Sequence, residues 1–181
     1  MMEWLLEKDG QFLLWLKETC AHPVLDKIMI FISSLGDKGM LWIAIGVLFL
    51  LLGFKNKVWV KRGLLVLFSL GANAVVCNLL LKPLVDRTRP YDLLGYDILI
   101  SPVGDASFPS GHTSASFAAA TAIYAINKKW GMAAYIFAAV MGFSRLYLGV
   151  HFPTDVLAGT AIGVVMAKVV LALMQKKWQK G

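Results

Sequence analysis

Residues 106–127 read ASFPSGHTSASFAAATAIYAIN, a run that contains no Lys, Arg, Asp or Glu. A helix needs about 20 mostly apolar residues to cross the hydrocarbon core of a bilayer. Four further runs are free of these charged residues or, in the last run, broken only by Lys168: 39–54, 63–81, 130–144 and 156–174. With flanking residues, all five runs reach spanning length. The sequence therefore predicts an all-α integral membrane bundle of about five spanning helices.

The composition of the whole chain agrees with a membrane protein. Of the 181 residues, 58% are hydrophobic and 16% are charged, whereas an average soluble protein has about 45–50% and about 25%. Such a chain has enough apolar surface to exclude a disordered protein, and two cysteines exclude a disulfide scaffold. The formal charge of +7 would suggest a nucleic-acid partner in a soluble protein, so the positions of the charges decide its meaning.

Five spans that alternate sides divide the charges into two sets. One set contains nine cations and no carboxylate: Lys55, Lys57, Lys61, Arg62, Lys128, Lys129, Lys176, Lys177 and Lys180. The other set contains eight cations and all eleven carboxylates, a net charge of −3. Short loops rich in Lys and Arg stay in the cytoplasm. We therefore expect a cytoplasmic C-terminus, with the connector 82–105 and the turn around His151 outside, and no nucleic-acid partner. The oligomeric state cannot be read from the sequence.

The first 37 residues differ from the rest. Residues 1–21 mix leucines and aromatic residues with six charged residues, which is typical of an amphipathic helix lying in the membrane interface. Pro23 opens a second short segment, for which we expect an interfacial or re-entrant helix. A sixth span over 28–54 is the alternative, but it would contain Asp37 and Lys38. The sequence thus predicts an interfacial segment over 1–37 and a membrane domain over 38–181.

Small residues recur at helical spacing in two of the runs. Gly159 and Gly163 form a Gly-x-x-x-Gly pair, and the run that begins at 106 has four alanines on one side: Ala115, Ala118, Ala119 and Ala122. Small faces let membrane helices approach closely. We therefore expect these two helices to pack against other helices through these faces.

Three polar clusters lie at the outer ends of the spans. The first is KPLVDRTRP at 82–90, the second is PSGH at 109–112, and the third comprises Ser144, Arg145, His151 and Asp155. On a helix, Lys82 and Arg89 would share one face two turns apart. Each cluster also has a structural interpretation: cations at helix ends can extend to the interface, Ser110 can cap a helix, and Arg145 and Asp155 can form an ion pair. The convergence of all three on one side favours a functional site.

The residue types at this side predict a phosphate site. Lys82, Arg89 and Arg145 can donate charge-assisted hydrogen bonds to phosphate oxygens. Ser110 and Gly111 stand at a helix start, where free N–H groups and the helix dipole favour an anion. A metal site is the competing interpretation, and the crowding of cations speaks against it.

The two histidines of the clusters supply the chemistry that such a site needs. His112 and His151 can act as acid or base and as nucleophile. Asp155 follows His151 by four residues, so we expect it to accept the Nδ1–H and leave Nε2 free to attack.

The three clusters resemble the tripartite signature of the type 2 phosphatidic acid phosphatase superfamily. Its first part is Lys, six residues and Arg-Pro; its second is Pro-Ser-Gly-His; its third is Ser-Arg, five residues, His, three residues and Asp. All three parts are present in order and at full spacing in 82–90, 109–112 and 144–155. The resemblance implies a vanadium-haloperoxidase-like helical core, and the apolar spans argue against the soluble peroxidases of this superfamily.

The resemblance also implies roles. His151 would attack phosphorus to form a phosphohistidine, Asp155 would orient it, and His112 would protonate the leaving oxygen and then activate water. The phosphate would be held by Lys82, Arg89, Ser110, Gly111 and Arg145, with no metal or other cofactor.

The implied enzyme is a membrane lipid phosphatase whose partners are a lipid phosphate and the bilayer. Undecaprenyl pyrophosphate is the favoured substrate by analogy, with phosphatidylglycerol phosphate or phosphatidic acid as alternatives. A phospholipid-binding protein without turnover and a purely structural membrane component are alternatives from other classes.

Overall fold

The computed structural model describes residues 2–54 and 56–178, which contain helices and connecting loops and no strand. The α-helices are α1 (Met2–Cys20), α2 (Pro23–Leu35), α3 (Met40–Leu52), α4 (Lys57–Ala74), α5 (Lys82–Val85), α6 (Pro90–Leu94), α7 (Gly111–Ile126), α8 (Lys128–Tyr147) and α9 (Pro153–Trp178). A 3₁₀ turn, η1 (Asp37–Gly39), joins α2 to α3, and a π-helical segment, η2 (Val75–Leu81), continues α4. The all-α prediction is confirmed for these residues.

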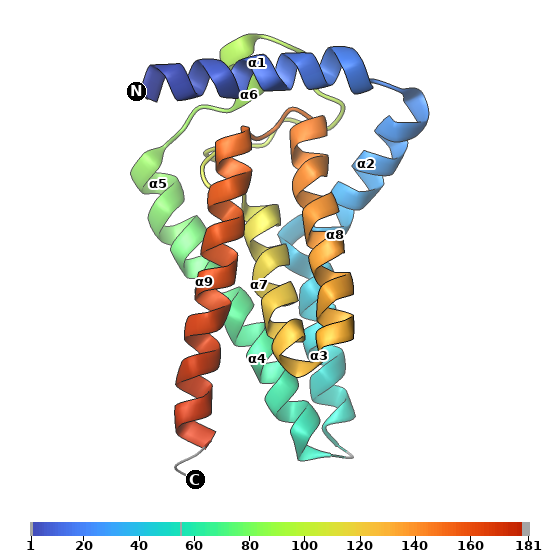
Figure 1. Ribbon diagram of the computed structural model, residues 1–181, viewed down its shortest axis with the longest axis vertical. Coiled ribbons are helices and arrows are strands. Elements are labelled where there is room, and N and C mark those ends of the chain that lie inside the picture. Colours follow the sequence, from blue (N-terminus) through green and yellow to red (C-terminus); the bar gives the residue numbers. More distant parts are fainter. Residues whose placement is uncertain (1, 55, 179–181) are drawn as a thin grey trace.

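Five helices form the body of the molecule: α3, α4, α7, α8 and α9 lie side by side along its long axis (Figure 1). Helix α7 contacts α4, α8 and α9, so it is the central element. Its buried positions are almost all Ala, Ser and Thr, and small side chains allow several neighbours to approach one helix at once. The indole of Trp42 on α3 donates a 3.0 Å hydrogen bond to Ser116 Oγ inside this core.

The predicted glycine pair Gly159–Gly163 packs against the backbone of α7 at Ser110, Ser114 and Ala118. A Cβ atom added to Gly163 of α9 would lie 2.3 Å from the carbonyl oxygen of Ser114 on α7, and one added to Gly159 would lie 2.8 Å from that of Ser110. Neither distance is compatible with a side chain, so glycine is required at both positions. This close contact holds the start of α7 against the start of α9.

Fewer helices meet the requirements of an independent span than the sequence predicts. Two are long and apolar enough to cross a membrane, within Lys57–Leu94 and Pro153–Lys176, and the bent pair of α2 with η1 and α3 raises the number to three. Helix α7 has only 16 residues, about 24 Å at 1.5 Å per residue, which is short of the core thickness. The predicted count of about five is therefore not confirmed.

The N-terminal helix α1 lies crosswise over one end of the bundle, beside α6, and the last turn of α9 lies at the opposite end (Figure 1). It contacts α8 and α9, and its helical extent agrees with the prediction for 1–21. Helix α2 runs from α1 to α3, and its axis is bent by 44° from that of η1 and α3. The break falls at Asp37 and Lys38, the charged residues that make a continuous span over 28–54 unfavourable.

The predicted basic set lies at the end of the bundle opposite α1. The α3–α4 connection, the α7–α8 turn and the C-terminal end of α9 are all found there (Figure 1). These segments contain Lys57, Lys61 and Arg62 in α4, and Lys128 and Lys129 in α8. Lys55 and Lys180 lie outside the described residues.

Candidate active site

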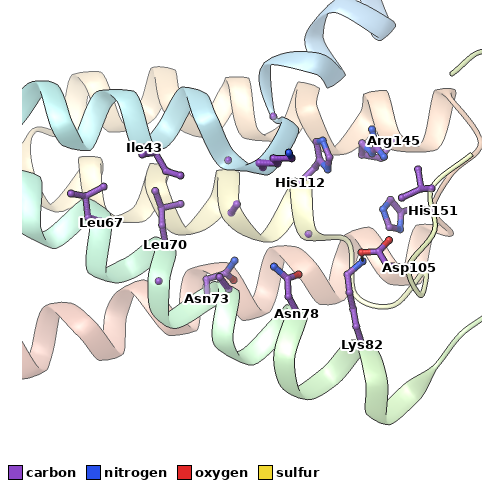
Figure 2. Close-up of a pocket in the computed structure, with 18 of the residues that line it drawn as sticks. Ile43, Leu67, Leu70, Asn73, Asn78, Lys82, Asp105, His112, Arg145 and His151 are labelled. Atoms are coloured by element: carbon purple, nitrogen blue, oxygen red, sulfur yellow. Dashed lines mark hydrogen bonds and ion pairs between the residues drawn. The ribbon is translucent and has the colours of Figure 1, made fainter. Parts of the chain in front are cut away.

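A cavity of about 690 Å³ opens among α3, α4, α7 and the connector that follows α5. One end is polar, and Figure 2 shows Lys82, Asp105, Arg145 and His151 grouped there. Its other end runs between α3 and α4 and is apolar, lined by Ile43, Leu67 and Leu70. His112 lies between the two ends. The predicted residues Lys82, Arg89, Gly111, His112, Arg145 and His151 all line this one cavity.

Lys82 and Arg89 converge, but not on one helical face as predicted. Helix α5 ends at Val85, and Asp86 follows in a left-handed conformation with φ 43°, so residues 86–89 leave the helix. Both cations reach Asp105 instead. Lys82 Nζ lies 2.6 Å from Asp105 Oδ2, and Arg89 Nη2 lies 2.5 Å from Asp105 Oδ1.

Asp105 is therefore the counter-ion of this cation pair. Partial burial would raise the pKa of its carboxyl, but hydrogen bonds from Lys82 and Arg89 outweigh burial and hold the pKa below its usual value. The carboxylate is thus ionised at neutral pH. The sequence places Asp105 in the connector without indicating this contact.

A π-helical segment brings Lys82 to the cavity. The η2 segment (Val75–Leu81) ends immediately before Lys82 and contributes Asn78 to the lining. Each π turn holds more residues than an α turn, so it rotates the following side chains relative to a continuous α-helix. Such segments are frequent at functional sites.

The start of α7 is buried beside α9, as the close glycine contact requires. Ser110 occupies the N-cap position, but its side chain hydrogen-bonds Thr113 Oγ1 at 2.9 Å and not a backbone N–H. The Ser110 N–H donates to the Asp155 carbonyl at 3.2 Å. Gly111 lines the cavity, and a Cβ there would meet Asn78 Oδ1 at 3.6 Å. The helix start therefore faces the polar end of the cavity.

His151 is buried beside Asp155 in the turn between α8 and α9. Its Nδ1 lies 3.7 Å from Asp155 Oδ2, which is longer than a hydrogen bond, and Nδ1 has no partner among the described residues. The carboxylate instead accepts from Ser107 Oγ at 2.6 Å and from the Phe152 N–H at 2.9 Å. Asp155 thus faces the predicted nitrogen, but the predicted hydrogen bond is absent here.

Burial lowers the pKa of the His151 imidazole to about 3, although the Asp155 carboxylate acts in the opposite direction. The imidazole is therefore neutral at physiological pH, and one ring nitrogen keeps a free lone pair. This is the state that a nucleophile requires.

His112 has a carboxylate partner that the sequence does not indicate. Its Nε2 lies 3.0 Å from Asp37 Oδ1 in the η1 turn, 75 residues earlier in the chain. The site thus contains two histidine–carboxylate pairs, His151 with Asp155 and His112 with Asp37.

Arg145 is buried at the end of α8 and does not pair with Asp155. Its Nη1 donates to Ser33 Oγ on α2, and its Nε has no hydrogen-bond partner among the described residues. Because buried polar groups are normally satisfied, this orphaned Nε fits a site that binds an anion.

The partner of Asp155 is Arg87, a residue that sequence reasoning missed. Arg87 Nη1 lies 2.6 Å from Asp155 Oδ1, and Arg87 Nη2 lies 3.0 Å from Asp9 Oδ2 on α1. Asp9 is buried and also accepts from the Thr154 N–H at 3.3 Å. The crosswise helix α1 is therefore connected to the segment that carries His151.

The donor set of the cavity suits an anion. Within 2–54 and 56–178, no group of three or more His, Cys, Asp or Glu side chains is arranged to hold a metal ion. The cavity instead brings together guanidinium, ammonium and imidazole groups with the N-terminal end of α7.

Comparisons with known proteins agree with this geometry. The family model described as the PAP2 superfamily matches residues 62–179. The chain is 30% identical over 145 residues to undecaprenyl-diphosphatase BcrC of Bacillus subtilis, which covers 80% of the chain and 72% of that protein. It is also 30% identical over 176 residues to a lipid A 4′-phosphatase of Porphyromonas gingivalis, covering 91% of the chain and 72% of that protein.

A solved structure shares the fold. The crystal structure of a transmembrane PAP2-type phosphatidylglycerolphosphate phosphatase from Bacillus subtilis superposes with a TM-score of 0.79 at 27% identity, over 94% of this chain and 86% of that chain. These three similar proteins act on different lipid phosphates.

Proposed function

The chain belongs to the PAP2 superfamily, and we propose that it hydrolyses the terminal phosphate of a lipid through a phosphohistidine, with undecaprenyl diphosphate as its favoured substrate. The observation that carries this proposal is the shape of the cavity. A cluster of cations and histidines forms one end, and an apolar wall between α3 and α4 forms the other. A molecule with a phosphate head and a long hydrocarbon chain matches both ends.

The phosphate would bind at the polar end. The orphaned Nε of Arg145 would gain a phosphate oxygen as its partner. Lys82 and Arg89 would give up part of their contact with Asp105 and bind phosphate oxygens instead. Ser110 and Gly111, at the N-terminal end of α7, would also hold the phosphate. Preorganised donors of this kind stabilise the charge of the transition state.

The histidines would carry out the two chemical steps. His151 would attack the terminal phosphorus with Nε2, because Nδ1 is the nitrogen that faces Asp155. His112 would donate a proton to the leaving oxygen and then take a proton from the water that hydrolyses the phosphohistidine. Asp155 and Asp37 would orient the two imidazoles. No metal takes part in these steps.

The placement in the membrane follows from the charges. The basic end of the bundle would face the cytoplasm and the cavity would face outside. In this arrangement α3, α4, α7, α8 and α9 are the five spans, and α1 lies in the outer interface. The chain then divides into an interfacial segment, 1–37, and a membrane phosphatase domain, 38–181.

The test is phosphate release by the detergent-solubilised protein in the presence of EDTA. We expect turnover by the wild type and a loss of at least about a thousandfold in His151→Asn. A panel of undecaprenyl diphosphate, phosphatidylglycerol phosphate and phosphatidic acid ranks the substrates by kcat/KM. A higher kcat/KM for phosphatidylglycerol phosphate would make that lipid the preferred substrate. Binding of all three lipids without turnover would show that the protein binds lipid phosphates and does not hydrolyse them.

A further inference from the structure

The turn between α2 and α3 places a cation in the cavity that is outside the three sequence clusters. Lys38 lines the same cavity as His112 and His151, although it lies more than 70 residues before either of them. Its neighbours Gly36 and Gly39 line the cavity as well. The η1 turn (Asp37–Gly39) therefore contributes Lys38 and Gly39 to the lining of the cavity.

The turn is fixed against His112. Asp37 Oδ1 contacts His112 Nε2 at 3.0 Å, and a Cβ atom added to Gly36 would lie 2.6 Å from His112 Cδ2. Lys38 directly follows the residue that contacts His112, and Ile43 of the apolar lining comes one turn into α3. Along the chain, Lys38 thus lies between Asp37, which contacts His112, and Ile43, which belongs to the apolar lining.

The left-handed backbone conformation of Lys38 costs free energy, and no contact of its side chain offsets that cost. Its backbone is left-handed, with φ 52° and ψ 16°, which costs an L-residue other than glycine roughly 1–2 kcal/mol. Its side chain is exposed and makes no hydrogen bond or ion pair with any residue in the described part of the chain. Strained residues that persist are concentrated at functional sites.

The other cations of the cavity have partners. Lys82 and Arg89 contact Asp105, and Arg145 donates to Ser33. Figure 2 shows Lys82, Arg145 and Asp105 at the end that contains His151, and Arg89 contacts Asp105 there. Lys38 makes no such contact within the described residues, so its ammonium is available to a second anionic group.

We propose that Lys38 binds the lipid-side phosphate of a lipid diphosphate, a subsite that extends the function proposed above and rests on it. When His151 attacks the terminal phosphorus, the bond from that phosphorus to the bridging oxygen breaks. The bridging oxygen leaves with the electron pair and takes a proton from His112, which gives a lipid monophosphate. Water then hydrolyses the phosphohistidine to inorganic phosphate.

The leaving group in this reaction is itself a phosphate, and it lies on the side of His112 that leads to the apolar lining. The Lys38 ammonium neutralises the charge that this group gains as the bond breaks. A lipid monophosphate has no second phosphate, so its hydrolysis does not use this contact. Lys38 thus selects diphosphates over monophosphates.

The test compares farnesyl diphosphate with farnesyl monophosphate, two substrates with the same hydrocarbon chain, in detergent micelles. Lys38→Asn removes the charge but keeps a residue that tolerates the left-handed backbone. We expect the ratio of kcat/KM for the diphosphate to kcat/KM for the monophosphate to fall at least about tenfold. Lys38→Arg should keep most of the wild-type ratio.

Lys27→Asn is the matched control, because Lys27 is an exposed lysine on α2 that does not line the cavity. It should leave the ratio at the wild-type value. The thermal midpoint of Lys38→Asn should equal or exceed that of the wild type, which separates a binding role from a folding role. An unchanged ratio in Lys38→Asn overturns the subsite while the proposed function stands, whereas persistent turnover in His151→Asn overturns the proposed function itself.

Discussion

Arg87 Nη1 lies 2.6 Å from Asp155 Oδ1, and the guanidinium also stacks on the Phe152 ring at 4.0 Å from its centroid. A second nitrogen of the same guanidinium is held by Asp9 of α1. The position of the carboxylate behind His151 therefore depends on a residue from the crosswise N-terminal helix.

This contact predicts a positioning role for Asp9. Asp9→Asn should lower kcat about tenfold and change KM less than about twofold, because Asp9 supports Asp155 through Arg87 and does not line the cavity. Steady-state kinetics on one lipid substrate measure both constants. Glu7→Gln, an exposed change on the same helix, should leave both constants unchanged. Loss of activity through KM alone would contradict this role.

Asp105 is expected to compete with phosphate for the two cations. Its carboxylate lies 2.6 Å from Lys82 and 2.5 Å from Arg89, and a negative charge there repels an incoming phosphate. Asp105→Asn should therefore lower the inhibition constant of inorganic phosphate about tenfold. The exposed Asp92→Asn in the same connector serves as the control. A weaker inhibition by phosphate in Asp105→Asn would show that the carboxylate instead orients the cations for binding.

The buried neutral His151 makes stability depend on pH. Its native pKa of about 3 lies below the value of about 6.5 for an unfolded histidine. Between these values the unfolded chain binds a proton that the native chain does not, so stability falls as the pH is lowered. From pH 6.5 to pH 5 this contribution is about 2 kcal/mol.

Thermal unfolding in detergent at several pH values measures this effect. His151→Gln should show a smaller loss of stability between pH 7 and pH 5 than the wild type. His22→Gln, which alters an exposed histidine at the start of α2, should keep the wild-type slope. Equal slopes in the wild type and His151→Gln would mean that this imidazole is not buried in its neutral form.

The glycine contact between α7 and α9 predicts a loss of stability on a minimal substitution. Gly163→Ala places a methyl group 2.3 Å from the Ser114 carbonyl oxygen, so the helices must move apart at a cost of about 1–3 kcal/mol. Gly71→Ala is the control, because a Cβ there meets nothing within 4 Å. A Gly163→Ala variant as stable as Gly71→Ala would contradict the packing.

The sequence predicts the helical bundle and the candidate site because both depend on local patterns. Charge-free runs mark the helices, and the three clusters at span ends converge in the cavity. Close helix packing at Gly159 and Gly163 could also be predicted, because small residues at i and i+4 share one face of any helix. The helical relation between Lys82 and Arg89 was wrong, since Asp86 in a left-handed conformation ends the helix.

The contacts that the sequence does not reveal join distant segments. Asp37 reaches His112, Ser33 reaches Arg145, and Asp9 reaches Arg87, each across 75 or more residues. All three come from the first 37 residues, which carry no part of the tripartite signature. Only the fold places α1, α2 and η1 over the site, so these residues could not be assigned from spacing.

If His151 carries the phosphoryl group, rapid quenching of the enzyme with a lipid diphosphate labelled with ³²P in its terminal phosphate should trap a labelled protein. We predict an acid-labile, alkali-stable label on the peptide that contains His151. The label should be absent in His151→Asn, whereas His112→Asn should slow both its formation and its hydrolysis, because His112 serves as acid in the first step and as base in the second. A label on any other residue, or undiminished turnover by His151→Asn, would show that His151 is not the nucleophile.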